Sequence, residues 1–171
     1  KLDKAVFFVE LSPAEPSQNG SDAAVFSGSM NYGERPVPLH KSASGGELAR
    51  LTLAIKVVLL DTFAPCTMIF DEVDSGISGA TAAAVGERLA RLGSKIQTLV
   101  VTHSPQVAAF GREHFKVSKG FDPEKQKTIT EVEQLDERCR EIEIARIISG
   151  DKITDEAMAA ARQLIKLGRK Q

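Results

Sequence analysis

Two short apolar runs in the middle of the chain, CTMIFDE at 66–72 and IQTLVVTH at 96–103, constrain its fold most strongly. Each run is continuously apolar until it ends in polar residues, which is typical of a strand buried on both faces of a sheet. The alanine-rich segment 79–93 between them predicts a helix. Because a strand, a helix and a second strand in this order form a parallel pair, the centre of the chain predicts an α/β fold.

The flanking segments add helices and antiparallel strands to this centre. Helix ends are marked by Ser104 before a proline, by Thr154 before an acidic turn, and by Gly150 after a helical stretch. Further helices are predicted at 46–61, 105–110, 136–149 and 155–167. Strands are predicted at 4–11, 22–29, 114–120 and 127–135, with loops of turn-forming residues at 11–21 and 31–44. We therefore expect a mostly parallel sheet flanked by helices, with some antiparallel strands at the N-terminus.

The bulk properties indicate one folded domain with no overall preference for an anionic partner. The 171 residues carry 22 Lys and Arg against 23 Asp and Glu, so the net charge is −1 and any contact with nucleic acid must be local. No apolar run approaches the roughly 18 residues of a membrane span, and there is no signal-peptide pattern. Cys66 and Cys139 belong to no metal-binding pattern. We expect reduced thiols in a cytoplasmic protein.

The stretch SASGGELAR at 42–50 has two interpretations. Ser44 and Glu47 have the spacing of a capping box, which would make the stretch an ordinary helix start. Gly45 and Gly46 argue for more, because a glycine in a helix costs roughly 1 kcal/mol relative to alanine. Without side chains there, the first helical amides and the positive end of the helix dipole can approach an anion closely. The stretch is therefore competent to bind phosphate.

Polar residues end both apolar runs. Asp71 can hold Mg²⁺, directly or through water, and Glu72 can orient an attacking water. The alternative is a strand that ends in a polar loop, but adjacent carboxylates repel each other and a metal would relieve that repulsion. A lone histidine is more often structural than catalytic. If the two strands are neighbours, however, His103 lies near the acids and can donate to a terminal phosphate.

The remaining polar features are individually weak. The segment SGISGA at 75–80 can be a flexible turn in which Ser78 or a neighbour caps the next helix. His40 and His114 have no partner pattern and are expected to be surface or packing residues. The last helix carries a basic stripe that is typical of a solvated face, with DNA contact as the less favoured alternative; its members are Arg162, Lys166, Arg169 and Lys170.

Taken in order, SASGGELAR, MIFDEVD, SGISG and VVTHSPQVAA resemble the signature motif, Walker B motif, D-loop and switch histidine of an ABC-type ATPase of the SMC kind. The closer resemblance is to the RecN family of bacterial SMC-like DNA repair ATPases, and RIISGDKIT near the C-terminus extends it over nearly the whole chain. The resemblance implies that residues 1–171 form a single C-terminal lobe of an ATPase head. No G-x-x-x-x-G-K-[ST] stretch is present, so the Walker A lobe and a coiled coil are expected outside this chain.

The resemblance also implies ATP and Mg²⁺ as cofactors and assigns the site residues. Asp71 would hold the metal, while Glu72 and His103 would be catalytic. Nucleotide-binding roles fall to Ser44, Gly45, Gly46, Glu47, Ser75, Gly76 and Ser78. The signature residues would cap the γ-phosphate of an ATP held by a second head. Ser78 stands where transporters and chromosomal SMC proteins carry aspartate, which puts that aspartate's role in doubt here, and Glu47 replaces the glutamine common in transporters.

The implied function is ATP hydrolysis in DNA double-strand break repair and recombination. The implied partners are the N-terminal lobe of the same protein, a second head in an ATP-dependent homodimer, and DNA through the full-length protein, with no membrane. The protein would be associated with the bacterial nucleoid, and the chain alone would be inactive. A helicase is excluded because its own phosphate loop is absent. Two alternatives remain: a docking lobe with idle nucleotide motifs, or the head lobe of another SMC-type chromosome-maintenance ATPase.

Overall fold

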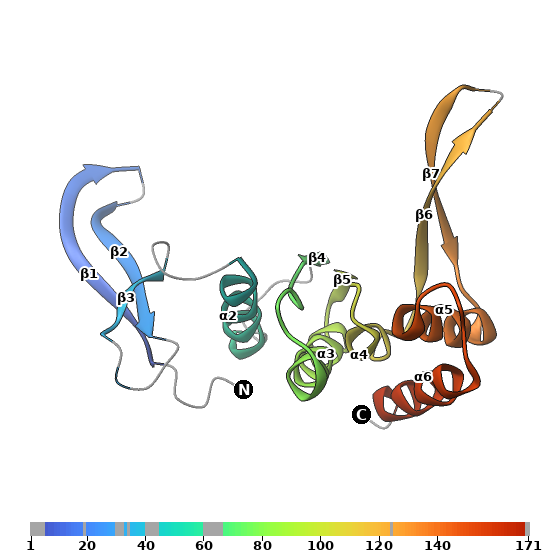
Figure 1. Ribbon diagram of the computed structural model, residues 1–171. Helices are drawn as coiled ribbons and strands as arrows, with labels where there is room; N and C mark the ends of the chain where they lie inside the picture. Colours follow the sequence, from blue (N-terminus) through green and yellow to red (C-terminus); the bar gives the residue numbers. More distant parts are fainter. Residues whose placement is uncertain are drawn as a thin grey trace. The chain divides into compact units, whose positions relative to one another are not determined.

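The computed structural model describes residues 6–18, 20–29, 33, 35–39, 45–59, 67–123 and 125–169. The chain divides into two compact units, 1–48 and 49–171. Figure 1 shows their helices and strands in chain order, from blue to red.

The first unit is built on an antiparallel hairpin. Strand β1 (Val6–Ser17) pairs with β2 (Gly20–Ser29), and β2 pairs with the short β3 (Val37–Pro38). The two long strands confirm the prediction, but the loops predicted at 11–21 and 31–44 are wrong in extent. Pairing continues almost to the turn because the register shifts between Pro13 and Ser17, and such an irregularity accommodates a proline within a strand.

The second unit contains the predicted parallel pair. Strand β4 (Thr67–Asp71) lies parallel to β5 (Gln97–Val101), and helix α3 (Gly79–Gly93) connects them. Helix α2 (Gly45–Val58) precedes β4 and begins within one residue of the predicted start. Side chains of both helices and both strands form one apolar core, whose buried members are Leu53, Met68, Phe70, Val73, Ala82, Val85, Leu89, Leu92 and Val107. The strand–helix–strand prediction is therefore confirmed.

Among the residues that the structure describes, only one face of the parallel pair is covered, whereas the sequence predicts cover on both faces. Met68 and Phe70 are buried on the core side, whereas Ile69 on the opposite side of β4 is 70% exposed. Leu99 and Val101 of β5 are also exposed. The parallel part is smaller than expected, because only β4 and β5 run parallel among the described strands. The α/β class is correct, and the other strand pairs are antiparallel.

The C-terminal part begins with the short helix α4 (Pro105–Ala108) and the antiparallel hairpin of β6 (Phe115–Asp122) and β7 (Lys127–Gln134), as predicted. Helices α5 (Glu137–Ser149) and α6 (Asp155–Gly168) follow and lie side by side in Figure 1. A second apolar core joins them to α4, with buried Ala109, Ile144, Ala145, Ala157, Ala161 and Ile165.

The predicted helix caps are present. The hydroxyl of Ser104 accepts a hydrogen bond from the Val107 amide at 3.4 Å, and that of Thr154 accepts one from the Ala157 amide at 3.2 Å. Gly150 ends α5 with φ +76°, a backbone conformation that glycine adopts without steric cost. These local signals are independent of the rest of the fold, which is why the sequence predicts them well.

The basic stripe of α6 is exposed, as predicted for a solvated face. Arg162 pairs with Glu141 at 2.9 Å and Arg169 pairs with Glu137 at 2.6 Å, so both arginines connect α6 to α5. Lys170 lies outside the described residues. None of the described helices is both long and apolar enough to span a membrane.

Candidate functional site

The parallel register brings the predicted catalytic residues to one end of the sheet. Asp71 is the last residue of β4 and pairs with Val101, the last residue of β5. Glu72 therefore follows one strand end, while Thr102 and His103 follow the other. Asp71, Glu72 and His103 are all exposed. The prediction that the two strands are neighbours is confirmed, and ligands of α/β sheets bind at this carboxyl end.

The turn that leaves β4 has an unusual backbone at Glu72. Its φ of +55° is in the left-handed region although the residue is not glycine. Such a conformation costs roughly 1–3 kcal/mol and is concentrated at functional sites. Hydrogen bonds hold the turn in place: the Ser75 amide donates to the Glu72 carbonyl at 3.0 Å, and the Ile77 amide donates to the Asp74 carbonyl at 3.3 Å. The strain at Glu72 favours a functional role for this acid over an ordinary polar loop.

Asp74 connects the two strand ends and was not among the predicted site residues. Its side chain is 1% exposed. Oδ2 accepts hydrogen bonds from the Thr102 hydroxyl and from the Ser104 amide, the latter at 3.2 Å. The signal in the sequence is the third acid of MIFDEVD, but nothing in that run distinguishes a buried acid from a solvated one.

Arg50 connects two of the sequence motifs and was also missed. This last residue of SASGGELAR lies in α2, and its Nη1 donates to the Ser75 carbonyl at 2.9 Å. The contact joins α2 to the turn that contains Ser75 and Gly76. Gly76 has φ +71°, so this turn position favours glycine.

Several predicted nucleotide-binding residues are not brought into this site by the described structure. Ser44 lies outside the described residues, so its capping box with Glu47 stays a prediction. Gly45 and Gly46 are the first residues of α2 and fall in the first unit. Ser78 occupies the N-cap position of α3, as considered for it, but its side chain makes no capping hydrogen bond.

The carboxylates at the strand end suit a magnesium ion that takes few ligands from the protein. Among the described residues, no group of three or more His, Cys, Asp or Glu side chains could hold a metal ion. Mg²⁺, however, keeps several waters and commonly takes only one or two protein carboxylates together with substrate phosphates. The exposed carboxylate of Asp71 at the strand end fits that requirement as a single ligand.

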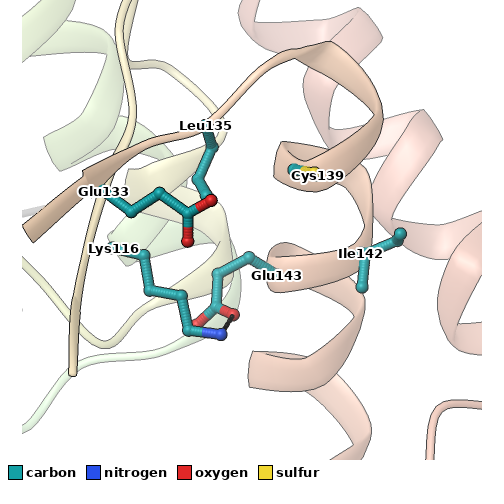
Figure 2. A pocket seen from close by; sticks show the side chains of 6 residues that line it. All are labelled: Lys116, Glu133, Leu135, Cys139, Ile142 and Glu143. Carbon is teal, nitrogen blue, oxygen red and sulfur yellow. Dashed lines mark ion pairs between the residues drawn. The ribbon is translucent and has the colours of Figure 1, made fainter. Parts of the chain in front are cut away.

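A separate hollow of about 130 Å³ lies between the base of the β6–β7 hairpin and α5 (Figure 2). The side chains of Lys116 and Glu143 meet there in an ion pair of 3.2 Å. The lining residues are Lys116, Glu133, Leu135, Cys139, Ile142 and Glu143. Cys139 is a free and exposed cysteine, in agreement with the predicted thiol. The hollow shares no residue with the strand-end site, and its basic group is already paired.

A half-buried histidine lies close to this hollow in the chain. Burial lowers the pKa of His114, and the nearby Arg140 guanidinium lowers it further. Arg140 is itself buried and donates through Nη2 to the carbonyls of Ala109 at 2.9 Å and Gly111 at 2.6 Å. The His114 imidazole therefore lies near the Arg140 guanidinium, which is hydrogen-bonded to carbonyls at the end of α4. The folded protein favours the neutral form of this imidazole.

Because of His114, we expect the free energy of unfolding to fall in mild acid. Because the pKa of His114 is lower in the folded than in the unfolded state, its contribution is present above the unfolded value of about 6.5 and is lost as the pH falls below it. We expect a lower urea midpoint at pH 5.5 than at pH 7.5, and a smaller difference in the His114→Asn variant. The pKa of Glu143 is lowered by its hydrogen bond to Arg146. The ion pair between Glu143 and Arg146 therefore weakens only at a pH below the range in which His114 becomes protonated. An unchanged pH dependence in His114→Asn would contradict the assignment.

Comparison with known proteins gives a consistent result. No family model matches the chain. The chain is 44% identical to the DNA repair protein RecN of Rickettsia conorii over 167 residues, which are 98% of this chain and 30% of the relative. It is 44% identical to RecN of Haemophilus influenzae over 168 residues, 97% of this chain and 30% of the relative. It is 46% identical to RecN of Xylella fastidiosa strain Temecula1 over 162 residues, 92% of this chain and 28% of the relative.

A solved structure shows the same fold. It comes from work on the structural biochemistry of ATP-driven dimerization and DNA stimulated activation of SMC ATPases, and it superposes with a TM-score of 0.53 at 20% identity. The match covers 85% of this chain and 83% of the other. The chain spans only 28–30% of the length of these RecN relatives.

Proposed function

We propose, from the similarity of this chain to RecN DNA repair proteins and from the fold that it shares with an SMC ATPase structure, that it is one lobe of a RecN-like ATPase acting in DNA double-strand break repair and recombination. The observation that carries the proposal is the pairing of Asp71 with Val101. It places two acids and a histidine at one sheet end, in the order that the motifs predict. Within a complete protein, residues 1–171 would form the C-terminal lobe of the head.

Each residue of the site has a role that suits its position. The Asp71 carboxylate would hold Mg²⁺, which supplies charge neutralisation at phosphate oxygens when bound. The Glu72 carboxylate would orient a water and accept its proton, and His103 would donate a hydrogen bond to the terminal phosphate. The signature segment would present the amides of Gly45 and Gly46 to the γ-phosphate of an ATP held by a second head. Ser44, Glu47, Ser75, Gly76 and Ser78 complete the proposed nucleotide contacts.

The uncovered face of the parallel pair supports a requirement for a second lobe. Ile69, Leu99 and Val101 expose apolar side chains on strands of a kind that proteins normally cover on both faces. A further lobe of the same protein, carrying the Walker A cradle, would cover this face and grip the nucleotide. The complete head would dimerise with ATP, bind DNA through the full-length protein, and act at the nucleoid in the cytoplasm.

The test is a chimera in which this chain replaces the matching segment of Haemophilus influenzae RecN. We expect no measurable ATP hydrolysis by the isolated chain and Mg²⁺-dependent hydrolysis by the chimera, measured beside the unmodified relative. Circular dichroism and sedimentation would first establish that the chimera is folded. A folded chimera that binds ATP without hydrolysing it, beside an active relative, would contradict the proposal and favour the docking-lobe alternative.

A further inference from the structure

The Asp74 carboxylate is the most deeply buried acid near the proposed site, and it has no role in the chemistry proposed there. It is 1% exposed, and the residue before it, Val73, is fully buried. Oδ1 has no hydrogen-bond partner within the part of the chain that the structure describes. The other carboxylate oxygen, Oδ2, accepts hydrogen bonds from the Thr102 hydroxyl and the Ser104 amide.

Those two donors flank His103. The Thr102 hydroxyl donates to Asp74, and the Ser104 amide is shared between Asp74 at 3.2 Å and the Thr102 hydroxyl oxygen at 3.0 Å. The Asp74 carboxylate, the Thr102 hydroxyl and the Ser104 amide are thus hydrogen-bonded to one another on both sides of the His103 backbone. His103 itself is exposed, so its backbone is anchored while its ring is open to a ligand.

We propose that Asp74 is the positioning residue for His103, holding the loop after β5 against the loop after β4 so that the histidine faces the same site as Glu72. The proposal rests on the proposed function for its catalytic consequence. The covalent connection is short: Glu72 and Asp74 are separated only by Val73, so the acid that anchors the histidine belongs to the turn that presents the proposed base. A shift of one loop would therefore be transmitted to the other.

Helix α4 extends this anchoring on its other side. Ser104 begins the helix as its N-cap, and Arg140 from α5 donates to the Ala109 and Gly111 carbonyls at its end. The N-terminal end is thus held by Asp74 and the C-terminal end by Arg140. Because burying a carboxylate is costly unless it is well paired, an acid with one unpartnered buried oxygen is a poor choice for stability alone. Its position is better explained by the geometry that it imposes on Thr102 and Ser104.

The first test uses nuclear magnetic resonance on the full 171-residue chain, following the ring signals of His103. We expect these signals to move in Asp74→Ala and in Thr102→Val, which remove the acceptor and the donor respectively. Thr102→Ser keeps the hydroxyl and is expected to restore the parent signals. Thr154→Ala is the matched control, because it removes the N-cap hydroxyl of α6 and weakens the fold without touching this loop.

Two outcomes would overturn the positioning role. One is a folded Asp74→Ala chain whose His103 ring signals match the parent. The other is a displacement of those signals in Thr154→Ala as large as that in Asp74→Ala, which would show a general loss of structure. If Asp74→Ala does not fold, the two Thr102 variants decide the question. His103 ring signals that move in Thr102→Val and return to the parent positions in Thr102→Ser support the positioning role of Asp74, and any other pattern rejects it.

The second test measures ATP hydrolysis in the RecN chimera. Misplacing a reacting group typically costs about 10- to 100-fold in rate, so we expect Asp74→Ala and Thr102→Val to lower kcat by that factor with little change in KM. Thr102→Ser should keep the parent kcat. An unchanged kcat in Asp74→Ala would overturn the catalytic consequence even if His103 moves. An inactive parent chimera would instead overturn the proposed function, and the His103 spectra alone would then decide whether Asp74 positions the histidine.

Discussion

The chimera carrying Glu72→Gln is expected to hydrolyse ATP at least about 100-fold more slowly than its parent, because loss of a general base typically costs 10²–10⁴ in rate. Glutamine keeps the size of the side chain and its Cβ, so the φ of +55° at this position remains equally strained in both proteins. The substitution removes only the charge and the proton-accepting oxygen. Steady-state hydrolysis and equilibrium binding of a fluorescent ATP analogue would be measured together, and binding should be retained.

The matched control is Glu87→Gln, which removes a carboxylate from an exposed position of α3. Its rate should equal that of the parent, so that a loss in Glu72→Gln cannot be ascribed to the change in net charge. If the Glu72→Gln chimera hydrolyses ATP at the parent rate, Glu72 is not the base. If both binding and hydrolysis fall, the carboxylate contributes to holding the nucleotide rather than to the chemical step.

The parts of the structure that the sequence predicts are those encoded by neighbouring residues. The apolar runs around Ile69 and Val100 are short and bounded by turns and helical segments, which is enough to predict β4, α3, β5 and their parallel arrangement. The caps at Ser104 and Thr154 involve atoms only three residues apart along the chain. Such signals do not depend on the rest of the molecule, so they can be recognised from a single sequence.

The missed contacts join residues that are far apart in the sequence. Thr102 and Ser104 reach Asp74 across 28 and 30 positions, and Arg50 reaches Ser75 across 25. No periodicity or spacing rule identifies such pairs. The exposed face of β4 was missed for a related reason: an apolar run predicts that both faces are covered, but not whether the covering residues belong to the described part of the chain.

The proposed site therefore consists of three groups of residues with different evidence. Asp71, Glu72 and His103 are predicted by motif and brought to one sheet end by the register of β4 and β5. Asp74 and Arg50 are known only from their contacts, and they hold the loops that carry the first group. The signature residues form a third group, because in the proposed function their ligand would be held by another molecule and their action would require assembly of two heads.

Replacing Ser44 with arginine is expected to abolish ATP-dependent dimerisation of the chimera. Ser44 immediately precedes Gly45, the first residue of the 14-residue helix α2, and the proposed γ-phosphate would approach the amides at this helix start. The glycines leave that approach open, whereas a long arginine side chain at position 44 would occupy it. Sedimentation in the Glu72→Gln background is the suitable measurement, because nucleotide would be bound but not consumed. We expect dimers from the background protein and only monomers from the Ser44→Arg protein.

Ser44→Ala separates the loss of a hydroxyl from the filling of the phosphate site. In the predicted N-cap role of Ser44, loss of the side chain would cost about 1 kcal/mol, so Ser44→Ala should weaken the ATP-dependent dimer without abolishing it. Circular dichroism would confirm that both variants keep the helix content of the background protein. An undiminished dimer in Ser44→Arg would show that the signature segment does not meet the phosphate of a second head. SASGGELAR would then be an ordinary helix start, while the assignment of Glu72, which rests on the sheet end, would be unaffected.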